Sequence, residues 1–123
     1  MIPEKLLEVL KHPGVVAIAT QGEDGPHLVN SWNSYLRISG EGRILIPAGY
    51  MQVTEANISR DSRVLVTIGT HEVAGMHGPG TGYLVKGTAA FVTSGPDFDV
   101  LKAKFAWARA TLAVTAESVT QTL

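Results

Sequence analysis

Short strand patterns joined by tight turns run through most of this chain and constrain its fold more than any other feature. Val15–Thr20 is a nearly continuous apolar run, the polar cluster Gln21–Pro26 follows as a turn, and a new strand begins at His27. A turn of this length joins antiparallel strands, whereas parallel strands need a crossover of about a dozen or more residues. The turns therefore favour a small antiparallel barrel over a doubly wound parallel sheet.

The rest of the chain continues this mainly β organisation. Residues alternate in hydrophobicity most clearly in Arg63–Thr70, which predicts a strand with one buried face. Further strands are expected at Leu36–Ile38, Arg43–Ile46, Tyr83–Thr93 and Ala110–Ala116. Helices are expected at Pro3–His12, Met51–Arg60 and Asp97–Ala108, at the ends and corners of the sheet. We expect one domain over residues 1–123, with about six strands and three helices.

Composition and charge exclude several classes of protein. The chain has 45% hydrophobic and 17% charged residues, which is typical of a globular domain. Its formal net charge of −1 gives no electrostatic footprint for nucleic acid or an anionic membrane. Because cysteine is absent, disulfides, thiol chemistry and cysteine-ligated metal centres are excluded. We find no signal-peptide pattern and no apolar run of the ~18 residues that a spanning helix needs, so we expect a cytoplasmic protein.

One segment breaks the alternation expected of a half-buried strand. Asn30, Ser31, Trp32, Asn33 and Tyr35 place hydrogen-bonding groups and aromatic rings close together in the sequence. Amides and hydroxyls can bond the polar edge of a planar ligand, and an indole or phenol ring can stack on its face. The segment therefore indicates contact with a flat, polar-edged cofactor. The alternative is an ordinary strand in which the amides and hydroxyls face water while Trp32 and Tyr35 pack inside.

A second candidate site lies where a strand gives way to a helix. Pro47–Tyr50 breaks the strand, and the helix expected at Met51–Arg60 follows directly. Free backbone N–H groups and the positive end of the helix dipole favour phosphate binding at such a corner. Gln52 and Thr54 offer additional hydrogen bonds there. The alternative is a plain helix cap.

Other motifs indicate no further chemistry. The glycine run Gly78–Gly82 precedes a strand rather than a helix and has the wrong spacing for a dinucleotide-binding or P-loop motif. We therefore read it as a connection that reverses the chain, with contact to a ligand left open. The four histidines lack the spacing of a metal pair, and no serine or threonine stands in a nucleophile motif. We expect neither a metal site nor a catalytic residue.

Nearly the whole chain resembles the pyridoxamine 5'-phosphate oxidase-like, FMN-binding split-barrel family, in particular its small bacterial members. The similarity is greatest in residues 14–36 and at the corner Thr54–Asn57. Shorter matching stretches are residues 73–75, 78–82, 89–91, 107–110 and 121–123. The resemblance implies a six-stranded antiparallel split β-barrel with short flanking helices. It further implies a homodimer that binds one FMN per subunit, non-covalently, at the subunit interface.

The resemblance also assigns roles to residues. It implies that Asn30–Asn33 lies along the flavin, Pro47–Gly49 and Trp107 lie beside the ring, the segment around Thr54 meets the phosphate, and the partner's Leu123 covers the dimethylbenzene edge. The expected cofactor-binding residues are Asn30, Ser31, Trp32, Asn33, Tyr35, Pro47, Ala48, Gly49, Gln52, Val53, Thr54, Trp107 and Leu123.

Two positions depart from the family pattern. Val53 stands where the family has a lysine that would pair with the phosphate, so we expect weaker FMN binding than in a lysine-bearing relative. Pro13 stands where the family has an acidic residue, and loss of a nearby carboxylate is expected to raise the reduction potential of the flavin.

The expected function is a small electron-transfer flavoprotein that exchanges electrons with a redox partner protein. Trp32, Tyr35 and Trp107 would pack and stack on the cofactor rather than catalyse a reaction. The alternative is a flavin-dependent oxidoreductase, such as a flavin reductase or a pyridoxamine-phosphate oxidase, although the basic cluster that an oxidase needs for its substrate phosphate is not evident. A third possibility is passive flavin binding, and some relatives bind haem or deazaflavin instead.

Overall fold

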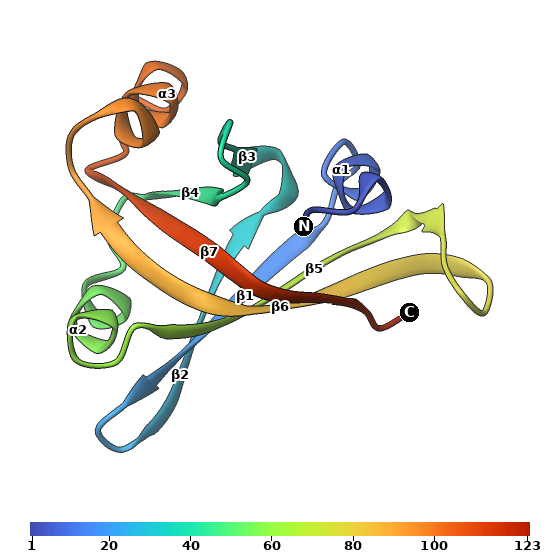
Figure 1. The fold of residues 1–123 in the computed structure, drawn as a ribbon, viewed down its shortest axis with the longest axis horizontal. Helices are drawn as coiled ribbons and strands as arrows, with labels where there is room; N and C mark the ends of the chain where they lie inside the picture. The colour runs from blue at the N-terminus through green and yellow to red at the C-terminus, as the bar shows by residue number, and fades with distance from the viewer.

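The computed structural model describes residues 1–123 as one seven-stranded antiparallel sheet with three short helices (Figure 1). The strands are β1 (Val15–Gly22), β2 (Gly25–Trp32), β3 (Arg37–Ile38), β4 (Ile44–Ala48), β5 (Arg63–Ala74), β6 (Pro79–Val92) and β7 (Ala110–Gln121). The helices are α1 (Glu4–Val9), α2 (Gln52–Arg60) and α3 (Pro96–Lys104), and a 3-10 turn, η1, spans Asn33–Tyr35. All strand pairs are antiparallel, and the order across the sheet is β2-β1-β5-β6-β7-β4-β3.

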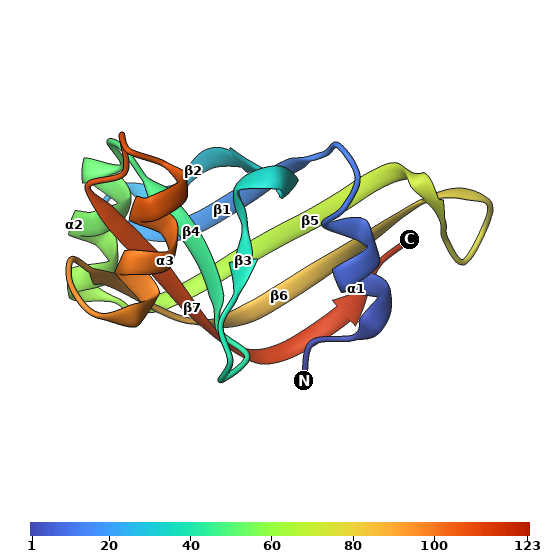
Figure 2. The same ribbon diagram turned by 90° about the horizontal axis from the view of Figure 1, so that it is seen from above.

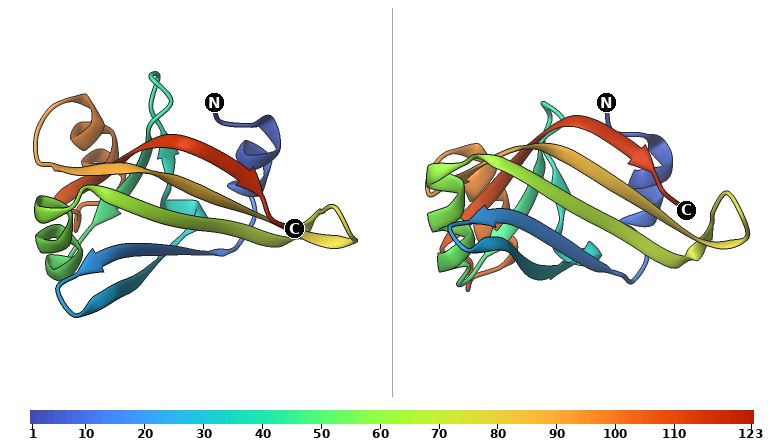
Figure 3. Two further views of the ribbon diagram at one scale, coloured as in Figure 1. Left: turned by 60° about the horizontal axis from the view of Figure 1, so that its bottom comes forward. Right: turned by 90° about the horizontal axis from the view of Figure 1, so that it is seen from below.

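The sheet curls so that its two edges, β2 and β3–β4, lie on the same side of the molecule (Figures 2 and 3). Helices α2 and α3 lie at one end of the curled sheet, while α1 lies toward the other end (Figure 2). The hairpin that joins β5 and β6 projects beyond the rest of the molecule (Figure 1). The curled sheet is thus a barrel that stays open between its edge strands.

The core fills the concave side of the sheet. Val64, Val66 and Ile68 of β5 are buried, as the alternating pattern predicts, whereas Leu65 between them is 44% exposed. Leu6 and Val9 of α1 are fully buried in the same cluster, so this short helix closes the core. Because apolar burial is the dominant favourable term in folding, this cluster stabilises the barrel and fixes which face of each strand points outward.

The mainly β, antiparallel prediction is confirmed, but the structure has seven strands rather than six. One predicted strand, which began at His27 and ran through Tyr35, ends at Trp32 and gives way to η1. The Asn33 side chain turns inward there and is 1% exposed, and its amide donates to carbonyl oxygens of α1 and β5. The turn separates β2 from the two-residue strand β3, which matches the short strand expected at Leu36–Ile38 and is the one that a count of six leaves out.

The last helix and the last strand also differ from expectation. Helix α3 ends at Lys104 rather than Ala108, because Lys102 Nζ donates to the carbonyls of Ala106 (2.6 Å) and Ala108 (2.8 Å) and the chain turns away. Strand β7 runs to Gln121, five residues beyond the prediction, since it pairs with β6 from Thr111 to Gln121, with one irregularity beside Gly87. None of the three helices combines the length and apolar character required to cross a bilayer.

Candidate functional site

A pocket of about 540 Å³ lies between edge strand β2 and the corner where β4 leads into α2. Its lining is mostly aromatic and aliphatic, with an amide and a hydroxyl among them. The lining residues are Val29, Asn30, Ser31, Trp32, Tyr35, Pro47, Gly49, Tyr50, Met51 and Trp107. Seven of these ten, all except Val29, Tyr50 and Met51, belong to the set expected from the sequence. The pocket is large enough for a small planar ligand.

Strand β2 contributes hydrogen-bonding groups to this pocket. It is the first strand in the sheet order, so its outer edge has no neighbouring strand and leaves backbone N–H and C=O groups unpaired. Asn30 Nδ2 donates to Val16 O at 3.3 Å, which fixes the side chain and leaves its carbonyl oxygen available. Ser31 is 5% exposed and Trp32 is 51% exposed. The strand edge can therefore bond the polar rim of a planar ring system while Trp32 offers an open indole face.

Tyr35 and Trp107 form a second wall, and the Phe105 ring packs against both of them without lining the pocket. The ring centroid of Trp107 lies 5.5 Å from that of Tyr35 and 5.6 Å from that of Phe105, and the Tyr35 and Phe105 centroids are 5.1 Å apart. The Trp107 ring lies against Gly49, where an added Cβ would come within 3.1 Å of Trp107 Cε3. Trp107 is half exposed. This arrangement presents a broad aromatic surface that can stack on a flat ligand.

The third wall is the corner before α2. Met51 is the N-terminal flanking residue of the helix, with φ 60° and ψ 33°, and no side chain caps the free N–H groups of the first turn. Thr54 in that turn is fully buried, yet its Oγ1 has no hydrogen-bond partner. An uncapped helix N-terminus beside an unpaired buried hydroxyl provides donors for an anion. Val53, in the same turn, is uncharged and 54% exposed, so this position supplies no cation to pair with an anion.

Six of the sequence-predicted residues do not line the pocket. Asn33 is turned into the interior, and Ala48 is fully buried in β4. Gln52, Val53 and Thr54 belong to the first turn of α2, directly after the pocket residue Met51. Leu123 lies in a separate groove.

Sequence reasoning missed three residues that line the pocket. Val29, Tyr50 and Met51 are absent from the expected cofactor-binding set, although Tyr50 and Met51 lie in the strand-to-helix corner predicted as a phosphate site. The exposed position of Tyr50 follows from the strand break at Pro47, so its contribution could have been inferred. The left-handed conformation of Met51 has no signal in the sequence, because such a conformation is ordinarily the property of glycine or asparagine.

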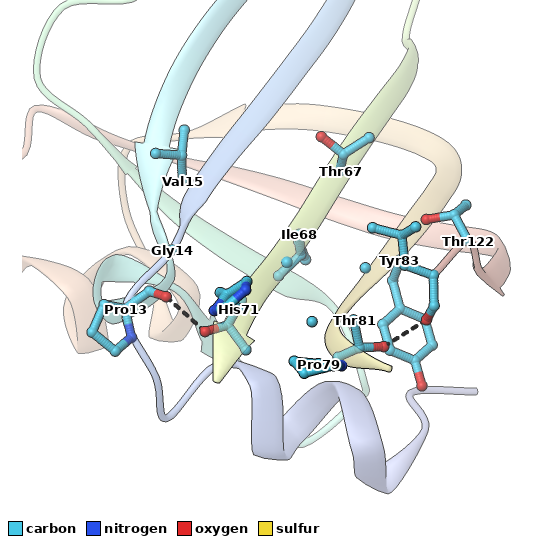
Figure 4. Close-up of a pocket in the computed structure, with 15 residues that line it drawn as sticks. Pro13, Gly14, Val15, Thr67, Ile68, His71, Pro79, Thr81, Tyr83 and Thr122 are labelled. Carbon is cyan, nitrogen blue, oxygen red and sulfur yellow. Dashed lines mark hydrogen bonds between the residues drawn. The ribbon is translucent and has the colours of Figure 1, made fainter. Parts of the chain in front are cut away.

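The separate groove is a shallow hollow of about 650 Å³ across β5 and β6 (Figure 4). Pro13 lies at one side of it, where its carbonyl accepts a hydrogen bond from Thr70 Oγ1 at 2.8 Å. Leu123 also lines the groove, where its carbonyl accepts a hydrogen bond from Thr81 Oγ1 at 2.9 Å. The glycine run predicted as a reversing connection contributes Gly80 and Gly82 to its floor. Within one chain, Pro13 and Leu123 therefore lie apart from the aromatic pocket.

Comparison with known proteins identifies the family. The sequence profile of the pyridoxamine 5'-phosphate oxidase family matches residues 2–122. The chain is 59% identical to a protein from Nitratidesulfovibrio vulgaris (strain DSM 19637 / Miyazaki F) named FMN-binding protein, over 123 residues and the full length of both chains.

Solved structures show the same fold at low sequence identity. HupZ of Group A Streptococcus matches with a TM-score of 0.79 and 17% identity, over 98% of this chain and 94% of that one. An FMN-binding protein from Syntrophomonas wolfei matches with a TM-score of 0.70 and 14% identity, over 98% and 88% of the two chains. The predicted split barrel is confirmed, with seven strands in place of six. This chain belongs to the pyridoxamine 5'-phosphate oxidase family.

Proposed function

We propose that this protein binds FMN non-covalently in the pocket between β2, the β4–α2 corner and Trp107. The observation that carries the proposal is the combination of an aromatic wall with an uncapped helix N-terminus and the unpaired, buried Thr54 hydroxyl. FMN is a flat, polar-edged ring that ends in a phosphate, and these features match its two parts. The 59% identical relative is itself named FMN-binding protein, which supports the same ligand here.

Each wall of the pocket has a role in holding this ligand. The edge of β2, with Asn30 and Ser31, would bond the polar rim of the ring, while Trp32 and Trp107 would exclude water from its faces. The first turn of α2 would receive the phosphate through backbone N–H groups and Thr54 Oγ1. When bound, FMN supplies the redox chemistry, and the protein supplies orientation and electrostatics.

We further propose that the protein is a homodimer with the cofactor at the subunit interface. The outward face of β2, β1 and β5 carries exposed apolar side chains: Leu28 is 69% exposed and Leu65 is 44% exposed, and both align with Ala19 between them. Trp32 and its cross-strand partner Val15, each about half exposed, continue this surface toward the pocket. Asn30, Ala17 and Thr67 form the row between these two apolar groups. Exposed apolar side chains gathered on one face are typical of a protein–protein interface. In such a dimer the groove that holds Pro13 and Leu123 would belong to the partner's side of the site.

We favour an electron carrier over an enzyme. The aromatic pocket lies against the surface, with Trp32 and Trp107 half exposed and Tyr50 82% exposed. A ring held there would lie near the surface of its own subunit, at the margin of the proposed subunit interface, which suits exchange of electrons with a redox partner protein. Arg37 is the basic residue beside the aromatic wall, with its guanidinium 5.5 Å from the Phe105 ring centroid and two donations to backbone carbonyls. A single engaged arginine does not form the basic cluster that a substrate phosphate requires.

Binding is tested by titrating the purified protein, after removal of endogenous flavin, with FMN and with riboflavin while following flavin fluorescence. We expect FMN to bind at least about ten-fold more tightly, because hydrogen bonds to a charged group contribute about 1.5–3 kcal/mol each. Thr54→Val is expected to weaken binding of FMN but not of riboflavin. Ser59→Ala, which removes an exposed hydroxyl near the other end of α2, is the matched control and should change neither. Equal affinity for the two flavins would contradict the phosphate assignment.

Two further experiments test the finer proposals. Sedimentation velocity should give a dimer that Leu65→Lys dissociates, whereas Val100→Lys, at a comparably exposed site on α3, should leave it intact. A Leu65→Lys variant that stays dimeric would contradict the interface. Steady consumption of NADH or NADPH by the flavin-loaded protein would favour an oxidoreductase over a carrier.

A further inference from the structure

Arg109 connects three segments that surround the pocket. Its backbone N–H donates to Ala48 O at 2.8 Å, which joins the residue before β7 to the end of β4. Its guanidinium Nε donates to Tyr50 O at 3.0 Å, and Nη2 donates to the same carbonyl. Nη2 also donates to Glu55 Oε1 of α2 at 3.0 Å. One residue thus ties β4, the corner and α2 to the chain that carries Trp107.

The carbonyl that accepts from the guanidinium, Tyr50 O, belongs to the peptide group that joins Tyr50 to Met51. Met51 is the one non-glycine residue of the structure with a positive φ. This region is unfavourable for a residue with a Cβ, so its conformation persists only where neighbouring contacts hold it. Two donors from Arg109 fix the orientation of the Tyr50–Met51 peptide from outside the pocket.

The geometry distinguishes this contact from an ordinary surface ion pair. Exposed pairs of long side chains contribute little. The Arg109 and Glu55 side chains are 35% and 42% exposed, so burial does not set this pair apart. The difference is that two guanidinium nitrogens donate to Tyr50 O, and the guanidinium also lies 5.7 Å from the ring centroid of Phe91, which restricts its motion. The planar fork of arginine can reach a carbonyl and a carboxylate at once, whereas the ammonium of lysine is a compact point charge on a flexible stem. Arg109 does not line the pocket, so it acts on a ligand only through the corner.

We propose that Arg109 is a positioning residue: its guanidinium holds the left-handed Met51 corner, and so aims the first turn of α2 at the phosphate of the ligand. The role rests on the proposed FMN site. Arg109 thus lies outside the site, but the shape of the site depends on it. Without its guanidinium, ligand binding would have to offset the unfavourable Met51 conformation.

A double-variant experiment on the full chain tests this role. We expect Arg109→Lys to weaken FMN binding by about ten-fold, the size of effect that corresponds to losing one stabilised backbone conformation. Met51→Gly should restore the affinity of Arg109→Lys to within about three-fold of the wild type, because glycine adopts a positive φ without support. Arg60→Lys, the same exchange near the other end of α2, is the control and should bind as the wild type does.

A second measurement needs no flavin. Amide hydrogen exchange in the first turn of α2 should become faster in Arg109→Lys and return toward the wild-type rate in the double variant. If Arg109→Lys does not fold, Glu55→Gln, which loosens the guanidinium at an exposed carboxylate, should show the same acceleration.

The outcomes are distinct. FMN affinity of Arg109→Lys within two-fold of the wild type, or a loss that Met51→Gly fails to restore, would overturn the positioning role. Wild-type protein that binds no FMN would overturn the proposed function, and unchanged exchange in the first turn of α2 would then overturn the role of Arg109 as well.

Discussion

Asn33 offers the sharpest test of whether a conspicuous polar residue serves the ligand or the fold. Its Nδ2 donates to His12 O and Gly69 O, each at 3.0 Å, and to Val9 O at 3.3 Å. The side chain is 1% exposed, and it joins the end of α1 to β5 at the turn that follows β2. Asn33→Ala removes the two N–H donors that these three carbonyls share, together with a buried Oδ1 that has no partner, and leaves a small cavity.

The expected cost follows from these contacts. Each net hydrogen bond contributes about 1 kcal/mol, and a buried carbonyl left without a partner costs at least as much, so we expect Asn33→Ala to destabilise the protein by about 3 kcal/mol. For a chain of 123 residues this lowers Tm by roughly 12 °C. Asn30→Ala is the matched control, because Asn30 is exposed and makes a single bond of 3.3 Å. We expect it to cost less than about 1 kcal/mol.

The assay is urea unfolding followed by far-UV circular dichroism, with and without saturating FMN. Ligand binding stabilises the folded state by mass action, so a residue that serves only the fold loses the same free energy in both conditions. An Asn33→Ala protein with wild-type stability in the absence of FMN, but with a reduced stabilisation by FMN, would refute the reasoning. It would return Asn33 to the cofactor-binding set expected from the sequence.

Three further outcomes are expected. Val53→Lys should tighten FMN binding by about two- to five-fold at low salt and lose the gain at high salt. The reason is that an exposed lysine beside the phosphate contributes less than about 1 kcal/mol and is screened by salt. No gain at low salt would contradict the phosphate position. Gly49→Ala should displace the Trp107 ring, since the added Cβ would lie 3.1 Å from Cε3, and weaken flavin binding by about ten-fold with little change in Tm; unchanged near-UV circular dichroism would argue otherwise. Arg63, through side-chain hydrogen bonds, lowers the pKa of Asp61 from 3.8 to about 2. Stability that this pair contributes above pH 4 should therefore be lost as the pH falls toward 2. Asp61→Asn should flatten the dependence of Tm on pH in that window.

Residues whose role depends on local pattern could be predicted from the sequence. The buried face of β5 follows from the alternation around Val66, and the start of α2 follows within one residue from the strand break at Pro47. The contributions of Trp32 and Trp107 to one pocket could be anticipated only through the family resemblance, since 75 residues separate them. Periodicity describes a strand or helix but carries no information about which distant segments meet.

Residues whose role depends on tertiary contact could not be predicted. Asn33 resembles a ligand-binding amide in the sequence because its neighbours are polar, and only the position of α1 shows where its donors go. The bond from Arg109 to Tyr50 O spans 59 positions and has no local signature. The left-handed conformation of Met51 could not be predicted either, since the sequence has no glycine at that position. Asn33 and Arg109 use side chains to bond distant backbone, and the Met51 conformation is held by one of those bonds; propensities do not describe such contacts.

The unpaired outer edge of β2 has a further consequence for how the purified protein behaves in storage. A bare strand edge can recruit the edge of another chain, and charge, proline or a covering group normally prevents this. Here Pro26 protects only the start of the strand, and the stretch from Leu28 to Trp32 carries no charge. Flavin-free protein should therefore aggregate sooner on storage than FMN-loaded protein, because the bound ring would shield that edge.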